Sequence, residues 1–352
     1  MTGNRLAPIA VSMGEPAGIG GEIALKAWRY RHSGGTAGSG SPPFFLIDDP
    51  ERLSAISAAL SLDVPIRVIE SPEDAAALFR EALPVVANPL AVPAAPGHPD
   101  PANGAAVIAA IERGAIWARD GRAAALVTNP IHKDTLNRAG FAFPGHTEFL
   151  GTLAGLPVDG PGPVMMLVCP GLRVVPVTVH IGLAEACAVL STEAIVSRAR
   201  VAAAALVHDF GIAEPRLAVA ALNPHAGENG RMGQEESAII APAVARIAAA
   251  GIAVTGPAPA DTLFHAAARR RYDAVICMYH DQALIPLKTI DFDHGVNITL
   301  GLPFVRTSPD HGTALNIAGR GCASEASLVS ALDMAAAIAG RRAHSGDRDH
   351  AA

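Results

Sequence analysis

The stretch that decides the fold is APIAVSMGEPAGIGGEIALKAWRYR, residues 7–31. It begins with a short apolar run at 7–13, passes through a turn that contains four glycines, and continues in a segment of helical composition at 20–31. A buried strand that leads closely into a helix is the repeating unit of α/β proteins. We therefore expect a strand at 7–13 and a helix at 20–31.

The same alternation continues along the chain. Short apolar runs bounded by Gly, Pro or Asn predict further strands at 43–49, 124–129, 163–169, 173–180, 216–223 and 272–280. Alanine-rich segments with helical spacing predict helices at 72–83, 105–120, 183–210 and 236–251. Two segments rich in Gly and Pro predict loops at 31–43 and 89–104. The pattern predicts an α/β fold with a mainly parallel sheet covered by helices.

Composition limits the classes of function. The chain has 352 residues, of which 50% are hydrophobic, and a net charge of −6. The apolar fraction excludes disorder as the main state, and the acidic balance argues against nucleic acid or an anionic membrane as partner. Four cysteines without a C-x-x-C pair are typical of a reducing compartment, and the most apolar stretch is too interrupted to span a membrane. We expect a cytoplasmic protein.

Three histidines follow predicted strands: His180 in VTVHIG, His225 in LNPHAGE and His280 in MYHDQ. Carboxyl ends of neighbouring parallel strands meet at one edge of a sheet, where α/β proteins place their sites. Three imidazoles with one open position form a site for zinc or a similar Lewis acid. Spacing alone leaves a structural role for each histidine open, because the three are far apart in sequence.

The segment 278–319 carries the densest set of polar groups, including Lys288, Asn297 and Arg306. Apolar residues flank both cations, in LIPLKTI and LPFVRTS, so we expect the two charges to be partly buried. A buried cation is costly without an anion, and an anionic substrate is a natural partner. The alternative is a surface strand whose basic residues are solvated.

Two shorter motifs and the glycine-rich turn allow both a structural and a functional interpretation. His146 and Thr147 follow a Pro-Gly turn in FPGHTEFL, and Asp261 lies in PADTLFH. Thr147 and Asp261 could each simply cap a helix. The turn at 14–21 lacks the G-x-G-x-x-G spacing of a dinucleotide fold, so it is either a plain strand-to-helix turn or a ligand loop.

Taken together, the motifs resemble the 4-hydroxythreonine-4-phosphate dehydrogenases of vitamin B6 biosynthesis. The resemblance extends from MGEPAGIG and TNPIHK through GHTEFL, LNPHAGE and PADTLF to YHDQ and GVNITLGLPFVRTSPDHGTA, and so spans nearly the whole chain. The chain departs from the family's usual GDPAGIGPE in having Glu15 for aspartate and Gly21 for proline.

The resemblance implies a homodimeric enzyme with a two-domain fold like that of isocitrate and isopropylmalate dehydrogenases. It implies a first α/β domain at 1–135 plus about 305–345, a second at about 136–304 with the dimer interface, and a frayed tail at 346–352. One divalent metal is implied on three histidines, with zinc first and magnesium or cobalt as alternatives, and NAD or NADP as cofactor. The implied metal ligands are His180, His225 and His280, with His180 joining the other two across the subunit interface. The implied substrate contacts are His146, Thr147, Lys288, Asn297, Arg306 and Asp261, and the implied cofactor loop contains His311, Gly312, Thr313, Ala314 and Gly319.

The reaction that the resemblance implies is oxidation of 4-phosphohydroxy-L-threonine at C3, followed by decarboxylation to 3-amino-2-oxopropyl phosphate. Lys288 is the first candidate for the general base and Asp281 the second. Relatives that oxidise phosphorylated threonate or erythronate, or dihydrodiol dicarboxylates, would carry nearly the same motifs. A three-histidine zinc hydrolase and a non-catalytic binding protein are the rivals from other classes.

Overall fold

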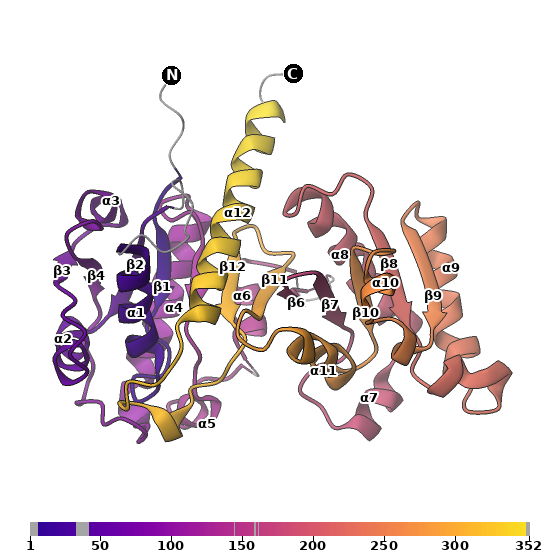
Figure 1. The fold of residues 1–352 in the computed structure, drawn as a ribbon, viewed down its shortest axis with the longest axis horizontal. Coiled ribbons are helices and arrows are strands. Elements are labelled where there is room, and N and C mark those ends of the chain that lie inside the picture. The colour runs from indigo at the N-terminus through magenta and orange to yellow at the C-terminus, as the bar shows by residue number, and fades with distance from the viewer. Residues whose placement is uncertain (1–5, 33–41, 144, 158–159, 161, 350–352) are drawn as a thin grey trace. The chain divides into compact units, whose positions relative to one another are not determined.

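The computed structural model describes residues 6–32, 42–143, 145–157, 160 and 162–349. The chain divides into two compact units. Unit 1 comprises 1–157 and 302–340, and unit 2 comprises 158–301 and 341–352. Figure 1 labels most of the helices and strands of both units. No helix within the described ranges combines the length and the apolar character needed to cross a bilayer.

Unit 1 is built on parallel strands in the order β3-β4-β2-β1-β5-β12. The strands are β1 (Ile9–Ser12), β2 (Phe44–Asp48), β3 (Ile66–Ile69), β4 (Leu83–Ala87), β5 (Leu126–Thr128) and β12 (Arg306–Pro309). The helices are α1 (Gly20–His32), α2 (Pro50–Ala59), α3 (Ala75–Leu78), α4 (Gly104–Arg119), α5 (Lys133–Arg138), α6 (His146–Leu153) and the part of α12 (Ala326–Asp349) up to Gly340. Helix α4 packs against β1, β2 and β5, which are buried along their whole length. The chain runs from β1 to β2 on one side of β1, whereas β5 lies on its other side, so β1 and β5 form a topological switch point.

Unit 2 has a mixed arrangement in the order β11-β6-β7-β10-β8-β9. The strands are β6 (Val164–Cys169), β7 (Leu172–Pro176), β8 (Arg216–Ala220), β9 (Ala253–Ala258), β10 (Ala274–Cys277) and β11 (Val296–Leu300). The helices are α7 (Leu183–Val189), α8 (Thr192–His208), α9 (Ala241–Ala249), α10 (Ala266–Arg269) and α11 (His280–Ile290), with a π-helical turn at Glu236–Ile240 before α9. Strands β7, β10, β8 and β9 are parallel, whereas β6 is antiparallel to both β7 and β11. Helix α11 covers a core of strand residues through Ala283 and Leu287.

All seven strands expected from the sequence are present, and the prediction of a mainly parallel α/β fold is confirmed. Three of the expected strands are too long at the carboxyl end: β7 stops at Pro176, β8 at Ala220 and β10 at Cys277. The helix expected at 72–83 was wrong in extent, because only short turns form there and Leu83 begins β4. The helix expected at 183–210 is interrupted, because Leu190 is extended and Ser191 caps α8 through Ala194 N–H.

Two expectations fall partly on residues outside the description. The loop predicted at 31–43 lies mostly in 33–41, which the structure does not describe. The backbone is helical as far as Asp349, so of the tail expected at 346–352 only 350–352 lie beyond α12, outside the described residues.

Candidate functional site

The three histidines lie beyond the carboxyl ends of three adjacent parallel strands in unit 2. Strand β10 lies between β7 and β8 and is parallel to both. His180 comes four residues after β7, His225 five residues after β8, and His280 begins α11 directly beyond β10. The expectation that all three follow neighbouring parallel strands is therefore confirmed.

Buried hydrogen bonds fasten these strand ends to one another. Thr178 Oγ1 donates to Met278 O (2.9 Å), which joins the chain after β7 to the chain after β10. Gln282 Nε2 donates to Ala221 O (2.7 Å), while Gln282 Oε1 accepts Met278 N–H (2.7 Å). Because Gln282 lies in α11 and is buried, it fixes the start of the His225 loop relative to the helix that begins at His280.

The rings of His180 and His280 lie close together within one chain, with centroids 6.0 Å apart and planes at 43°. His280 Nδ1 donates to Asp281 Oδ1 (2.7 Å), which leaves the opposite nitrogen, Nε2, available to a ligand. His180 adopts a left-handed backbone conformation (φ 55°). The geometry does not require the expected route across a subunit interface for His180, since its ring already lies beside that of His280.

His225 begins a strained turn. Five consecutive residues, 225–229, have φ between 43° and 73°, and only Gly227 among them is a glycine. Each non-glycine residue in this conformation costs roughly 1–2 kcal/mol, so the turn has to be held by its surroundings. Within the described ranges, no three His, Cys, Asp or Glu side chains of one chain are gathered as a metal site. The structure thus pairs His180 with His280 and leaves the complete ligand set a prediction.

The other site residues predicted in unit 2 lie on a helix, on a strand and in a loop. Lys288 lies in α11, seven residues after Asp281 and so on the same side of the helix, with Nζ 5.2 Å from the centroid of the Phe292 ring. Asn297 lies in β11, and its Oδ1 is buried with no hydrogen-bond partner among the described residues. Asp261 is exposed three residues after β9, the strand beside β8, and so lies at the same edge as the histidines.

Arg306 is the predicted substrate-binding residue that lies on a strand of unit 1. It begins β12, is 3% exposed, and its Nη2 donates to Thr128 Oγ1 (2.6 Å) at the end of β5. Burial lowers the pKa of its guanidinium to about 10. The expectation of a buried cation in LPFVRTS is confirmed.

Sequence reasoning assigned no role to the polar groups at the β1/β5 switch point. Ser12 Oγ and Asn129 Oδ1 are both buried there without a hydrogen-bond partner among the described residues, and Asn129 Nδ2 donates to Ser12 O (3.1 Å). Gly14 has φ 68°, and a Cβ at this position would lie 2.7 Å from Pro130 O, so the two loops touch through the glycine. The signal was present in TNPIHK, but only the order of the strands shows that this motif faces the MGEP turn.

The side chains of His146 and Thr147 lie outside the described residues. The backbone of α6 begins at His146, and a Cβ on the preceding residue, Gly145, would lie 3.6 Å from Lys133 Nζ. Lys133, the last residue of TNPIHK, is not among the site residues predicted from the sequence.

The expected cofactor loop follows β12 in unit 1. Ile19 N donates to Thr313 O (3.1 Å), and Ala314 is left-handed (φ 45°), so the loop lies against the glycine-rich turn. A cavity of about 500 Å³ is bordered by Gly18 of that turn and Gly319 of the loop. Among the five expected cofactor residues, only Gly319 lines this cavity.

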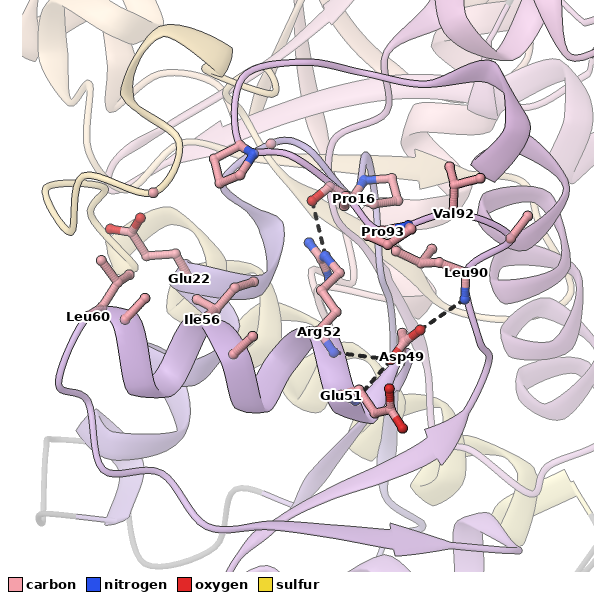
Figure 2. A pocket seen from close by; sticks show the side chains of 17 residues that line it. Pro16, Glu22, Asp49, Glu51, Arg52, Ile56, Leu60, Leu90, Val92 and Pro93 are labelled. Atoms are coloured by element: carbon pink, nitrogen blue, oxygen red, sulfur yellow. Dashed lines mark hydrogen bonds between the residues drawn. The ribbon is translucent and has the colours of Figure 1, made fainter.

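Helix α2 and the loop after β4 form two walls of the cavity (Figure 2). Asp49 holds them together, because its carboxylate accepts Leu90 N–H (2.9 Å) as well as Glu51 and Arg52 N–H at the start of α2. Arg52 Nε donates to Pro16 O (3.0 Å), and Arg52 Nη1 is bonded to the buried Asp48 at 2.8 Å. The cavity therefore has rigid walls, with apolar side chains on both sides and carboxylates at its edge.

The family of this chain follows from its match to a known family model. The model described as "Pyridoxal phosphate biosynthetic protein PdxA" matches residues 41–335. The chain belongs to the PdxA family. A PdxA relative from Caulobacter vibrioides named 4-hydroxythreonine-4-phosphate dehydrogenase is 53% identical over 95% of this chain and 98% of its own. A relative of the same name from Maricaulis maris is 54% identical over 96% of this chain and 99% of its own.

Solved structures agree with this PdxA assignment. The crystal structure of 4-hydroxythreonine-4-phosphate dehydrogenase from Klebsiella pneumoniae has a TM-score of 0.82 at 39% identity, over 95% of this chain and 99% of that one. A terephthalate 1,2-cis-dihydrodiol dehydrogenase from Burkholderia xenovorans has a TM-score of 0.60 at 28% identity, over 95% and 98%. The resemblance inferred from the motifs is confirmed.

Proposed function

We propose that this PdxA-family chain oxidises 4-phosphohydroxy-L-threonine at C3 with NAD or NADP, and that decarboxylation then gives 3-amino-2-oxopropyl phosphate. One observation carries the proposal: a chain 53% identical to a 4-hydroxythreonine-4-phosphate dehydrogenase pairs His180 and His280 at an edge of parallel strands. The dihydrodiol dehydrogenase is less similar in both sequence and structure, which places its substrate class second.

His180 and His280 lie near the spacing that shared coordination of a divalent metal requires. With zinc–nitrogen distances of about 2.0–2.1 Å, each ring centroid lies about 3.2 Å from the ion, so two coordinating rings have centroids at most about 6.4 Å apart. Tetrahedral coordination brings the two centroids to about 5.2 Å, so the rings of His180 and His280, at 6.0 Å, would have to approach each other slightly to share an ion. His180, His280 and His225 would hold the ion, which would supply a Lewis acid that eases deprotonation of a bound hydroxyl. Asp281 orients His280 through its Nδ1.

Arg306 is proposed to bind the phosphate end of the substrate. A buried cation costs free energy, and a dianionic phosphate bound nearby offsets this cost. His146 and Thr147, at the start of α6, would add donors to the same group. Asn297 Oδ1, which is buried and without a partner among the described residues, would accept a hydrogen bond from a substrate hydroxyl or amine.

Lys288 is proposed as the general base that takes the C3 hydroxyl proton at Nζ. It is half-buried and lies on the same helix as His280, which keeps the base and a metal ligand in fixed register. Asp281 is the second candidate, but its bond to His280 suits it better to orient that ring. Asp261 at the same edge would contact the polar end of the substrate.

The cofactor is proposed to lie along His311, Gly312, Thr313, Ala314 and Gly319. The cavity bordered by Gly18 and Gly319 is large enough for a nucleoside and has apolar walls that suit a base. NAD or NADP would supply the hydride acceptor. The chain's own contribution is a loop held against the glycine-rich turn through Ile19.

A homodimer is proposed to complete the site. Directly after His180, the apolar side chains of Ile181, Leu183 and Val189 are 38%, 59% and 52% exposed, and a second subunit covering them would surround the metal ligands. A cytoplasmic location is supported by the four free cysteines.

The deciding experiment follows NADH or NADPH formation with 4-phosphohydroxy-L-threonine, phosphorylated threonate, phosphorylated erythronate and a cis-dihydrodiol dicarboxylate. We expect the largest kcat/KM with 4-phosphohydroxy-L-threonine, and 3-amino-2-oxopropyl phosphate as product. A larger kcat/KM with another of these substrates transfers the proposal to that substrate. Ester or phosphate hydrolysis without any reduction of the cofactor would instead support the three-histidine hydrolase.

A further inference from the structure

One buried carboxylate, that of Glu236, accepts hydrogen bonds from the residues that lead into the turn of His225. Glu236 is 6% exposed and lies at the first residue of the π-helical turn before α9. Its Oε1 accepts Leu222 N–H (2.9 Å) and Asn223 N–H (2.7 Å), and its Oε2 accepts from Asn223 Nδ2 (3.0 Å). Three hydrogen bonds from the stem of the His225 turn therefore end on one charged group.

The same carboxylate limits what can occupy the turn. A Cβ on Gly227 would lie 2.5 Å from Glu236 Oε2, and Gly227 itself has φ 73°. The turn packs directly on the carboxylate, and only glycine allows this close approach. Glu236 thus contacts the stem of the turn at 222–223 and its middle at 227.

The left-handed residues 225–229 need such support because, apart from Gly227, they occupy a region that L-residues avoid. Gln282 anchors the chain one step earlier, at Ala221 O. Between that anchor and His225, the structure describes the carboxylate of Glu236 as the acceptor of both intervening N–H groups, those of Leu222 and Asn223.

We infer that Glu236 is a positioning residue for the proposed metal ligand His225: its bonds to Leu222 and Asn223 hold the strained turn in one conformation and so fix the place of His225 beyond β8. The inference rests on the proposed metal site and extends it to a residue that touches neither metal nor substrate. Residues that orient metal ligands typically change metal affinity by about 10- to 100-fold when removed.

The test compares Glu236→Ala, Glu236→Gln and the matched neighbour Glu235→Gln in the full-length protein. Glu235 Oε2 also accepts from Asn223 Nδ2 (2.7 Å), but none of the backbone bonds of the turn end on it. Co²⁺ is added to metal-free protein, and its affinity and visible absorption are measured. We expect Glu236→Ala to weaken Co²⁺ binding about 10- to 100-fold and to alter the absorption band. Glu236→Gln keeps an acceptor for the two backbone N–H groups and should restore most of the affinity, while Glu235→Gln should stay within about threefold of the parent.

A second readout, amide hydrogen exchange by mass spectrometry, does not depend on metal. We expect faster exchange at 222–230 in Glu236→Ala and no change in β8 or β10. Unchanged exchange in this segment, or unchanged Co²⁺ affinity and absorption in Glu236→Ala, would overturn the inference. If the parent protein itself gives no Co²⁺ spectrum, the proposed metal site fails, while exchange at 222–230 still decides whether Glu236 holds the turn. Should Glu236→Ala not fold, Glu236→Asp, whose carboxylate is one methylene shorter and so is withdrawn from the N–H groups of Leu222 and Asn223, provides the same two measurements.

Discussion

The polar side chains at the strand ends are buried in unit 1, whereas the candidate metal ligands of unit 2 are wholly or partly exposed. In unit 1, Arg306, Asn129 and Glu15 are at most 3% exposed and lie at the ends of β12, β5 and β1. In unit 2, His180 and His225 are exposed and the side chain of His280 is 37% exposed. Groups of the first kind are fixed by the packing of the sheet itself, whereas groups of the second kind depend on short turns held by individual hydrogen bonds. Substitutions in unit 1 should therefore change binding without moving the fold, and those in unit 2 should change the site through its turns.

The largest effect is expected from His280→Ala in unit 2. Loss of a metal ligand removes the Lewis acid, which is worth several kcal/mol of transition-state stabilisation, so kcat/KM should fall about 10⁴-fold. The measurement is cofactor reduction together with metal content. His294→Ala is the control, because His294 is also an exposed imidazole of unit 2 that is paired with an aspartate, Asp291. Equal losses in the two variants would contradict a specific role for His280.

Lys288→Ala should reduce kcat about 10³-fold, since general base catalysis contributes about 10²–10⁴-fold. KM should change far less, because the proton is transferred only in the transition state. Steady-state kinetics as a function of pH measures both. A near-normal kcat would assign the base to Asp281, which Asp281→Asn then tests.

Arg306→Met tests whether a buried residue of unit 1 affects substrate binding without affecting stability. Loss of charge-assisted bonds to phosphate should raise KM about 100-fold with a smaller change in kcat. Thermal unfolding without substrate should occur at the same or a higher temperature, because a buried cation is replaced by an apolar side chain of similar length. Arg138→Met, on the exposed face of α5, is the control. A large drop in Tm would show that Arg306 holds the fold together, and would weaken the phosphate assignment.

The smallest effect is expected from Glu15→Gln at the switch point. Burial raises the pKa of Glu15 above its ordinary 4.5, although Ala17 N–H donates to it at 3.1 Å. A folded carboxyl that binds its proton more strongly than the unfolded one contributes most to stability at acid pH, and this contribution is lost as pH rises through the raised pKa. The neutral variant should therefore gain stability relative to the parent as pH rises, by at most a few degrees in Tm.

The Tm values of the parent, of Glu15→Gln and of the exposed control Glu70→Gln are measured from below pH 4.5, the ordinary pKa of the carboxyl, up to neutral pH. If the difference in Tm between parent and Glu15→Gln does not change with pH, the ionised carboxylate of Glu15 does not lower the stability of the folded protein.

The sequence predicted the strands of the core well because buried strands are short, apolar and bounded by turn residues. It missed β3 and β9, whose residues are partly exposed and so lack a continuous apolar run. It also missed the largely buried strands β4, β11 and β12, whose sequences LPVVA, VNITL and RTSP are interrupted by proline or polar residues. It also extended three strands too far, two of them to a histidine and one to Asn223, since VTVH, AALN and CMYH continue the apolar pattern past the last pairing residue. Apolarity indicates burial, but it does not show where a ladder of hydrogen bonds ends.

The candidate site was predictable in its residue types and less so in its supports. His180, His280 and Arg306 could be named from their positions after strands or within apolar runs, together with the family resemblance. The supports Gln282, Glu236 and Ser12 could not, because each acts through a contact between segments that only the order of the strands brings together. The left-handed turn at 225–229 was equally hidden, since four of its five residues are not glycine.

The π-helical winding at Glu236–Ile240 has a consequence for how this protein can vary. A π turn contains one residue more than the α-helical turn it replaces. Deleting a single residue there would restore ordinary winding and rotate the residues before it by about 100° relative to α9. The carboxylate would then point away from the loop that it now supports, even though every side chain in the neighbourhood kept its chemistry. Chain length at this one turn is thus under tighter constraint than residue identity at most positions around it.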